Sequence, residues 1–114
     1  MLPNRLNLFK STEDELKRLK QNTGLTPNVA ARIAFAISLR EGFRFEANAD
    51  SRHPDGTLNL DKITWFGDQA PLYELLLAKA YPLLEGKELE TAWASHVESG
   101  AAKLKGRRQI HELI

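Results

Sequence analysis

The chain has 114 residues, a length that suits one domain, and its 42% hydrophobic and 27% charged residues are typical of a globular protein. It contains no cysteine, which excludes disulfides, thiolate metal sites and cysteine nucleophiles. No run is apolar enough to cross a membrane and the opening "MLPNRLNLFK" lacks the apolar core of a signal peptide, so we expect a cytoplasmic protein.

The net charge of +1 conceals an uneven distribution of charged residues. Residues 1–44 carry a net charge of +4, residues 45–100 carry −6 and residues 101–114 carry +3. Two basic ends therefore flank an acidic middle. This asymmetry indicates a polyanionic partner on one face, although chance clustering of solvated charge explains it equally well.

The N-terminal stretch predicts a short strand followed by a helix. "RLNLFK" alternates leucine with other residues, a pattern typical of a strand. "STEDELKRLKQN" predicts a helix, because Thr12 and Glu15 have capping-box spacing and Gly24 follows as a C-cap residue. Thr26 and Pro27 then give the start signal of a second helix.

The second predicted helix, over residues 26–41, is apolar on more than one side. One face carries Val29, Ile33, Ala36, Ile37 and Arg40, and another carries Phe35 and Leu39. We therefore predict a homo-oligomer, in which one side packs on the later helices and the side with Phe35 meets a second copy. The alternative is a central helix that its own chain surrounds completely.

A polar segment and two further helices are predicted after residue 42. Pro54, Asp55 and Gly56 mark a turn, and residues 58–67 fit either a short extended piece or an irregular loop. Pro71 opens a third helix, and a fourth runs to Ser99 before a glycine breaks it. The apolar face of the third comprises Leu72, Leu75, Leu76, Ala80, Leu83 and Leu84, and that of the fourth comprises Leu89, Ala92, Trp93, His96 and Val97. Residues 1–114 are thus predicted to form a single, mainly α domain.

No arrangement of residues indicates catalysis, a metal site or a cofactor. His53, His96 and His111 lack the short spacing of metal ligands, and the carboxylates between residues 50 and 68 fit a solvated loop. Glycine-rich phosphate loops and a serine nucleophile elbow are missing from the sequence. We therefore expect a protein that is not an enzyme, and an enzyme acting on DNA or nucleotides is the weakest hypothesis.

The order strand, helix, glycine, helix over residues 5–42 resembles a ribbon-helix-helix DNA-binding unit. In that fold two chains pair their strands and place them in the major groove. The resemblance implies that Arg5, Asn7 and Phe9 face the groove. It also implies that Thr26 and Asn28 lie near the DNA backbone.

A closer resemblance covers the whole chain. The stretches "RLNLFKSTEDELKRLKQNTGLTPNVAARIAFAISLREG" and "LNLDKITWFGDQAPLYELLLAKAY" are similar to the DndE family, the small E component of the Dnd DNA phosphorothioation system. The resemblance implies a DNA-associated accessory subunit that acts with the other Dnd components, and it supplies no catalytic motif. Because the chain lacks cysteine, it cannot carry a persulfide or hold an iron–sulfur cluster through thiolates.

The basic residues predict a DNA surface that contacts phosphates. Its expected centre is the first helix, Arg5 adds to it, and the C-terminal segment forms a second patch. The central residues are Lys10, Lys17, Arg18 and Lys20, and those of the second patch are Lys103, Lys105, Arg107 and Arg108. Such contacts are largely independent of base sequence and weaken steeply with salt. The alternative is a protein–protein adaptor in the modification complex that does not bind DNA directly.

Overall fold

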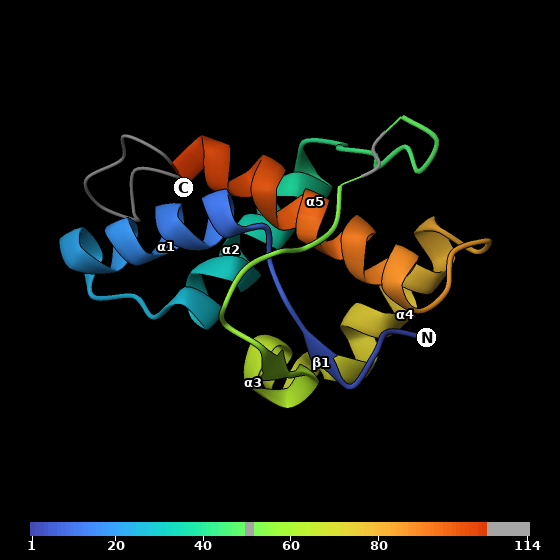
Figure 1. The fold of residues 1–114 in the computed structure, drawn as a ribbon, viewed down its shortest axis with the longest axis horizontal. Helices are drawn as coiled ribbons and strands as arrows, with labels where there is room; N and C mark the ends of the chain where they lie inside the picture. The colour runs from blue at the N-terminus through green and yellow to red at the C-terminus, as the bar shows by residue number, and fades with distance from the viewer. Residues whose placement is uncertain (50–51, 105–114) are drawn as a thin grey trace.

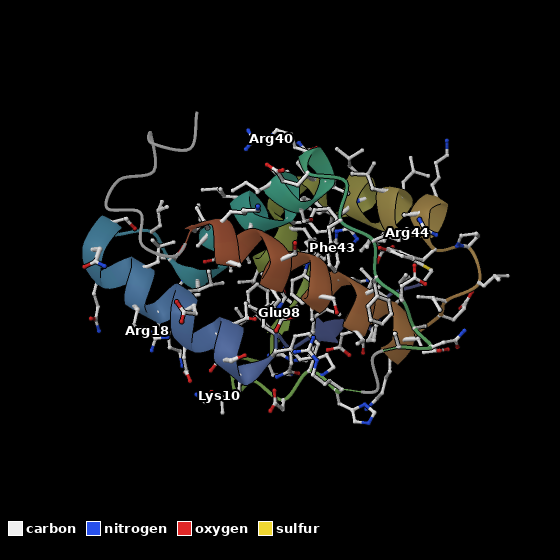
Figure 2. The ribbon with its side chains drawn as sticks, turned by 90° about the horizontal axis from the view of Figure 1, so that it is seen from above. Lys10, Arg18, Arg40, Phe43, Arg44 and Glu98 are labelled. Atoms are coloured by element: carbon white, nitrogen blue, oxygen red, sulfur yellow. The ribbon has the colours of Figure 1, made fainter. Side chains whose placement is uncertain are left out.

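Helices make up most of the structure, a computed structural model that describes residues 1–49 and 52–104 (Figure 1). The elements in chain order are β1 (Arg5–Leu6), α1 (Lys10–Thr23), α2 (Pro27–Arg40), β2 (Leu60–Asp61), α3 (Lys62–Phe66), a 3₁₀ turn (Gly67–Gln69), α4 (Ala70–Ala80) and α5 (Lys87–Leu104). α5 packs on both α1 and α2, α1 also contacts α2, and Figure 2 shows α4 on the side of α5 opposite α1. The predicted mainly α fold is confirmed.

The start of α1 depends on a residue far away in the sequence. The helix begins at Lys10, whose N–H donates to the Asp55 carboxylate at 2.7 Å. The predicted capping box at Thr12 is therefore wrong, and Thr12 is buried inside the first turn. The end of the helix follows the sequence signal, because Gly24 adopts a φ of 80° and its N–H bonds the carbonyl of Lys20.

α2 and α5 form the closest helix pair in the molecule. α2 begins at Pro27, as predicted, and buries Ala30, Ala31 and Ala34. A Cβ added at Gly100 would lie only 1.7 Å from the carbonyl oxygen of Ala34, so this glycine lets the two backbones touch. The prediction that α5 ends before Gly100 is wrong, because the glycine serves the helix crossing and the helix continues to Leu104.

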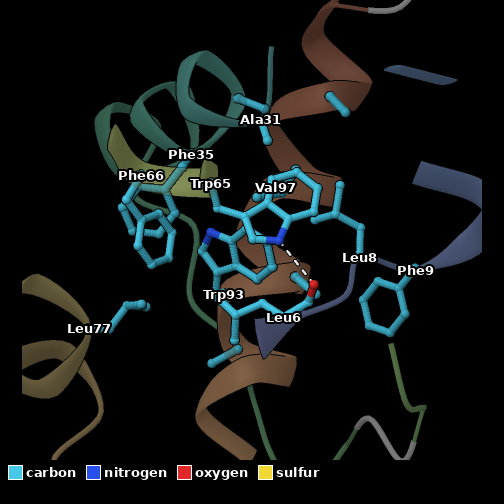
Figure 3. Packing of buried hydrophobic residues seen from close by; sticks show 14 of the residues in the cluster. Leu6, Leu8, Phe9, Ala31, Phe35, Trp65, Phe66, Leu77, Trp93 and Val97 are labelled. Carbon is cyan, nitrogen blue, oxygen red and sulfur yellow. Dashed lines mark hydrogen bonds between the residues drawn. The ribbon is translucent and has the colours of Figure 1, made fainter. Parts of the chain in front are cut away.

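Two tryptophans fill the centre of the core (Figure 3). The rings of Trp65 and Trp93 meet edge to face with centroids 5.2 Å apart. The indole N–H of Trp65 donates to the carbonyl of Leu6 at 2.9 Å, so the buried polar atom has a partner. Residues 58–67, for which the sequence left two alternatives, thus form β2 and the short helix α3, and α3 places Trp65 in the core.

β1 finds its partner strand within the same chain. It pairs antiparallel with β2, with Arg5 opposite Asp61 and Leu6 opposite Leu60. The predicted order of strand, helix and helix is therefore present. However, one edge of β1 is already paired with β2 of the same chain. In a ribbon-helix-helix unit, the strand pairs with the strand of a second chain instead.

The inward faces of α2 and α4 differ from those that the sequence suggested. Phe35 is 1% exposed and packs on the rings of Tyr73 and His96, so its prediction as an outward residue is wrong. The outer side of α2 carries Ala36 and Leu39 instead. On α4 the buried leucine is Leu77, and most of the predicted apolar stripe faces outward.

Candidate nucleic-acid interface

The charged face of α1 carries the four basic residues predicted as the centre of a DNA surface. All four are exposed, because Leu16 and Leu19 turn the opposite face of the helix into the core. These four residues are Lys10, Lys17, Arg18 and Lys20. The predicted exposure of these residues is confirmed. How strongly each one can attract a phosphate depends on which carboxylates lie beside it.

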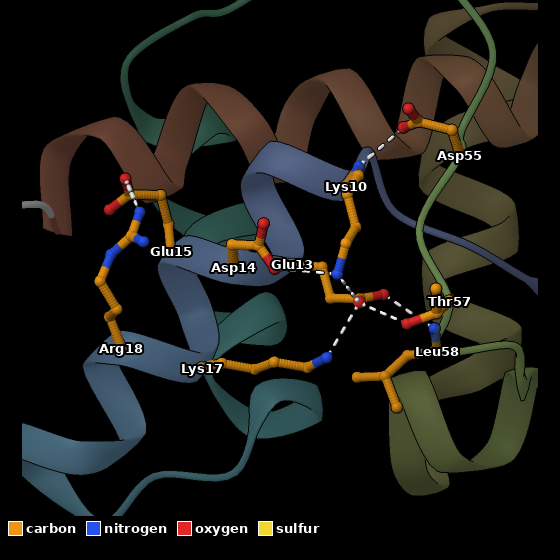
Figure 4. A network of polar contacts seen from close by, with 9 residues as sticks. All are labelled: Lys10, Glu13, Asp14, Glu15, Lys17, Arg18, Asp55, Thr57 and Leu58. Atoms are coloured by element: carbon orange, nitrogen blue, oxygen red, sulfur yellow. Dashed lines mark hydrogen bonds and ion pairs between the residues drawn. The ribbon is translucent and has the colours of Figure 1, made fainter.

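Glu13 is a buried carboxylate in the first turn of α1 (Figure 4). It accepts hydrogen bonds from the Leu58 N–H and the Thr57 hydroxyl, both at 2.8 Å. The ammonium groups of Lys17 and Lys10 reach the same carboxylate at 3.0 and 3.4 Å. Burial disfavours the charged form, but these hydrogen bonds outweigh burial and lower the pKa of Glu13 to about 2. Glu13 therefore stays negative beside two of the predicted DNA-binding lysines.

Further ion pairs compensate the positive charge along α1. Lys10 also pairs with Asp14 at 3.0 Å, and this hydrogen bond, followed by the one to Glu13, raises the pKa of Lys10. One turn later Arg18 pairs with Glu15. From Lys10 to Arg18, three basic and three acidic residues therefore balance one another.

Lys20 is the exception on this face. It is exposed in the last turn of α1 and joins no ion pair with residues 1–49 or 52–104. No charged residue follows it before the start of α2 at Pro27. The C-terminal end of α1 is thus where the predicted surface keeps uncompensated positive charge.

A shallow groove between α1 and α5 borders the charged face. It has a volume of about 350 Å³, and its charged lining residues are Asp14, Glu15, Arg18 and Glu98. Among the described lining residues carboxylates outnumber cations, so this part of the groove disfavours a phosphate.

β1 does not form an exposed reading surface. Arg5 is exposed, but its guanidinium donates to the side chain and the carbonyl of Asn59. Asn7 accepts from the Asn59 amide, and Phe9 is buried beneath the Arg52 guanidinium, which lies 4.1 Å from the ring centroid. The prediction that Asn7 and Phe9 face a DNA groove is wrong, because both side chains pack against the segment that precedes β2.

The remaining predicted residues are scattered. Thr26 is exposed just before α2, whereas the Asn28 amide donates to the carbonyl of Thr64 at 3.1 Å. Lys103 is exposed in the last turn of α5. The other members of the second patch, Lys105, Arg107 and Arg108, lie outside the described residues.

Two exposed arginines at the far end of α2 were not part of the predicted surface. Arg40 lies 3.9 Å from the carboxylate of its neighbour Glu41, and Arg44 stacks over the ring of Tyr81 at 4.7 Å. Figure 2 places both away from Lys10 and Arg18. Both arginines contribute to the net positive charge of residues 1–44. The sequence could not show that they lie on a different side of the molecule from the basic residues of α1.

Three exposed leucines lie on α4. Leu72, Leu75 and Leu76 are 47%, 55% and 37% exposed, and we call these three residues the apolar α4 face. Leu39 of α2 is also exposed, and α2 and α4 lie on the same side of α5 (Figure 2). Extended exposed apolar surfaces often mark contacts with other molecules.

The described residues contain a buried serine–histidine pair and no cluster of metal-ligating side chains. Ser38 and His96 are hydrogen-bonded at 2.8 Å, but both side chains are buried and no substrate can reach them. Within residues 1–49 and 52–104, no three histidine, aspartate or glutamate side chains cluster to hold a metal. None of the helices in these ranges is long and apolar enough to span a membrane.

Comparison with known proteins identifies the family. The model of the family described as "DNA sulphur modification protein DndE" matches residues 5–112. The chain belongs to the DndE family. The resemblance noted in the sequence is thus confirmed, and the protein is a component of the DNA phosphorothioation system.

Two solved DndE structures are similar over nearly the whole chain. DndE from Escherichia coli B7A, involved in DNA phosphorothioation modification, is 54% identical, with 92% of this chain and 99% of that chain covered and a TM-score of 0.88. A DndE mutant with glycines replaced by lysine, involved in DNA phosphorothioation, is 52% identical, with 92% and 100% covered and a TM-score of 0.85. A search among curated proteins gave no match.

Proposed function

We propose that this DndE-family protein is a cytoplasmic, non-catalytic accessory subunit of DNA phosphorothioation that binds the DNA backbone. The observation that carries the proposal is the exposed basic face of α1, which ends in Lys20 with no carboxylate partner among the described residues. Phosphate contacts hold a protein on the duplex without reading bases, so binding is largely independent of sequence. Because the chain has no cysteine, it handles DNA or the other Dnd components and not the sulfur itself.

Ion pairing decides which residues of α1 contribute most to binding. A phosphate that approaches Lys10 or Lys17 must compete with the buried carboxylate of Glu13. Lys20 has no such competitor in the described structure, and a phosphate at Arg18 must compete with the half-buried Glu15. We therefore place the centre of the DNA surface at the C-terminal end of α1, with Lys10 and Lys17 at its edge.

Lys20→Ala is expected to weaken DNA binding more than Lys17→Ala. Loss of one phosphate contact lowers the slope of log affinity against log salt by about one, whereas loss of a lysine paired with Glu13 changes it little. Fluorescence anisotropy with a labelled duplex at several salt concentrations measures both slopes. Equal slopes for wild type and Lys20→Ala would contradict this assignment. Parallel mobility shifts with intact duplex, nicked duplex and single strand show which form binds best.

The alternative function, a protein–protein adaptor without direct DNA contact, is favoured by the apolar α4 face. The same binding assay separates the two functions. If wild type binds none of the three DNA forms at low salt, the adaptor hypothesis replaces the DNA proposal. If removal of residues 105–114 abolishes binding while Lys20→Ala does not change it, the C-terminal segment is the site.

We also propose that the apolar α4 face joins copies of this chain into a homo-oligomer. Its three leucines occupy positions i, i+3 and i+4 of one helix, which is the spacing of side chains in packed helix pairs. A two-fold contact would bury the same leucines from both copies. Oligomerisation would also place several α1 surfaces on one DNA molecule and so raise the affinity.

Leu75→Asp is expected to dissociate the oligomer without unfolding the subunit. The side chain is more than half exposed, so aspartate is solvated in the free subunit but is unfavourable in an apolar contact. Light scattering at micromolar concentration measures the mass. Ile63→Asp is the matched control, because Ile63 is 65% exposed but lies on α3. A wild-type protein that is monomeric throughout this range would contradict the proposal.

A further inference from the structure

A buried chain of hydrogen bonds ends at the last turn of α4. Ser38 of α2 and His96 of α5 meet at 2.8 Å, and the other ring nitrogen of His96 meets the Tyr81 hydroxyl at 2.6 Å. Tyr81 is the C-cap residue that directly follows the last residue of α4, Ala80. All three side chains are buried, so this polar connection runs through the apolar core between three helices.

The hydrogen bonds have only one consistent direction. The Phe45 N–H donates to the Tyr81 oxygen at 2.8 Å, and the Ser38 hydroxyl donates its single hydrogen to the carbonyl of Phe35 at 2.6 Å. Ser38 must therefore accept from Nδ1–H of His96, which leaves Nε2 to accept from the Tyr81 hydroxyl. The chain runs without interruption from one backbone N–H to one backbone C=O, and it requires a neutral imidazole.

The surroundings of His96 favour this neutral form. The ring packs on the rings of Phe35 and Phe43, with centroids 5.3 and 4.9 Å away, and on Tyr81. The charged group that acts on it is Arg44, which follows Phe43 and stacks on Tyr81. Burial, followed by the positive charge of Arg44, lowers the pKa of His96 to about 4.

We propose that this chain of hydrogen bonds, the His96 relay (Phe45, Tyr81, His96, Ser38 and Phe35), positions the C-terminal end of α4, which follows the apolar α4 face, and lets this end loosen when His96 gains a proton. A proton on Nε2 would point at the Tyr81 hydroxyl, whose own hydrogen would then lose its acceptor. The relay is thus a positioning device for the C-terminal end of α4. Its role in assembly rests on the proposed oligomer.

The rest of α4 is held by contacts nearer its start. Tyr73 stacks on Phe66 with centroids 4.7 Å apart, and Glu74 pairs with Lys62. Leu77 is buried in the core. At the C-terminal end, the polar contact to the core is the Tyr81 hydroxyl, so loss of the relay affects this end first.

Tyr81→Phe tests the relay by removing one oxygen atom. Hydrogen exchange at pH 7 is expected to become at least about tenfold faster for the last amides of α4, while amides in the middle of α1 keep their rates. Tyr73→Phe is the matched control, because it makes the same change on the same helix and its hydroxyl bonds no described residue. In wild type, lowering the pH from 7 to 4 should also speed exchange of the last α4 amides more than that of amides in the middle of α1, after correction for the intrinsic rate.

Two results would overturn the relay. One is equal acceleration in α1 and α4 of Tyr81→Phe, which would show a general loss of stability. The other is a ¹⁵N spectrum that places the proton of His96 on Nε2. Hydrogen exchange of the Leu75→Asp variant distinguishes the relay proposal from the oligomer proposal. The exchange rates in α4 report the relay even when the protein is a monomer. If the wild type is a monomer but shows the predicted exchange pattern, only the oligomer proposal is rejected.

Discussion

Gly100→Ala is expected to destabilise the protein by about 3 kcal/mol or more, or to prevent folding. The new Cβ would lie 1.7 Å from the carbonyl oxygen of Ala34, and a helix backbone cannot move aside as a flexible side chain does. α2 and α5 would have to separate, which opens gaps around the buried alanines of α2. In an open helix the same substitution stabilises by about 1 kcal/mol, so the expected sign is reversed here.

Urea denaturation followed by circular dichroism measures this effect. Ser99→Ala is the matched control, because it lies in the same turn of α5 and is only half-buried. We expect its free energy of unfolding to stay within about 1 kcal/mol of wild type. If Gly100→Ala unfolds at the wild-type urea concentration, the two helices cannot be in the contact that the structure shows.

Acid is expected to destabilise the protein in two separate pH ranges. His96 has a pKa of about 4 when folded and 6.5 when free, so between these values the unfolded chain binds a proton that the folded chain does not. Stability therefore falls as the pH drops from 6.5 to 4, by up to about 3 kcal/mol. Glu13, with a pKa of about 2 against 4.5, stabilises the fold above pH 4.5 and loses this effect toward pH 2.

Denaturation at several pH values distinguishes the two groups. His96→Gln should flatten the dependence between pH 6.5 and 4, and Glu13→Gln should flatten it below 4.5. Each variant is less stable than wild type at pH 7, because a buried hydrogen-bond network loses a member. A wild-type stability that does not change between pH 6.5 and 4 would show that His96 is protonated in the folded state.

Local signals predicted the parts of the fold that depend on neighbouring residues. Gly24 ends α1 and Pro27 begins α2, because both effects act within one helical turn. The start of α1 could not be predicted, since its cap, Asp55, lies 45 residues away. The sequence predicted that Gly100 ends the fourth helix. A glycine that ends a helix cannot be distinguished in a sequence from one that lets a second helix pack closely.

Periodicity located apolar faces but not the side that each face meets. The stripe on α5 is buried as expected, whereas that on α4 points mostly outward and only Leu77 enters the core. For the DNA surface, the sequence identified exposed lysines correctly. It could not show that Glu13 neutralises two of them, because Glu13 is buried only when Thr57 and Leu58 fold over α1.

The capping of α1 by Asp55 also determines when the DNA surface can form. A nascent chain that ends before Leu58 lacks the partners of Glu13, and one that ends before Asp55 lacks the cap of α1. The helix with the predicted DNA contacts is therefore completed only after about half of the chain has been synthesised. A peptide of residues 1–44 would lack both Asp55 and the hydrogen-bond partners of Glu13. We therefore expect α1 to be unstable outside the complete domain.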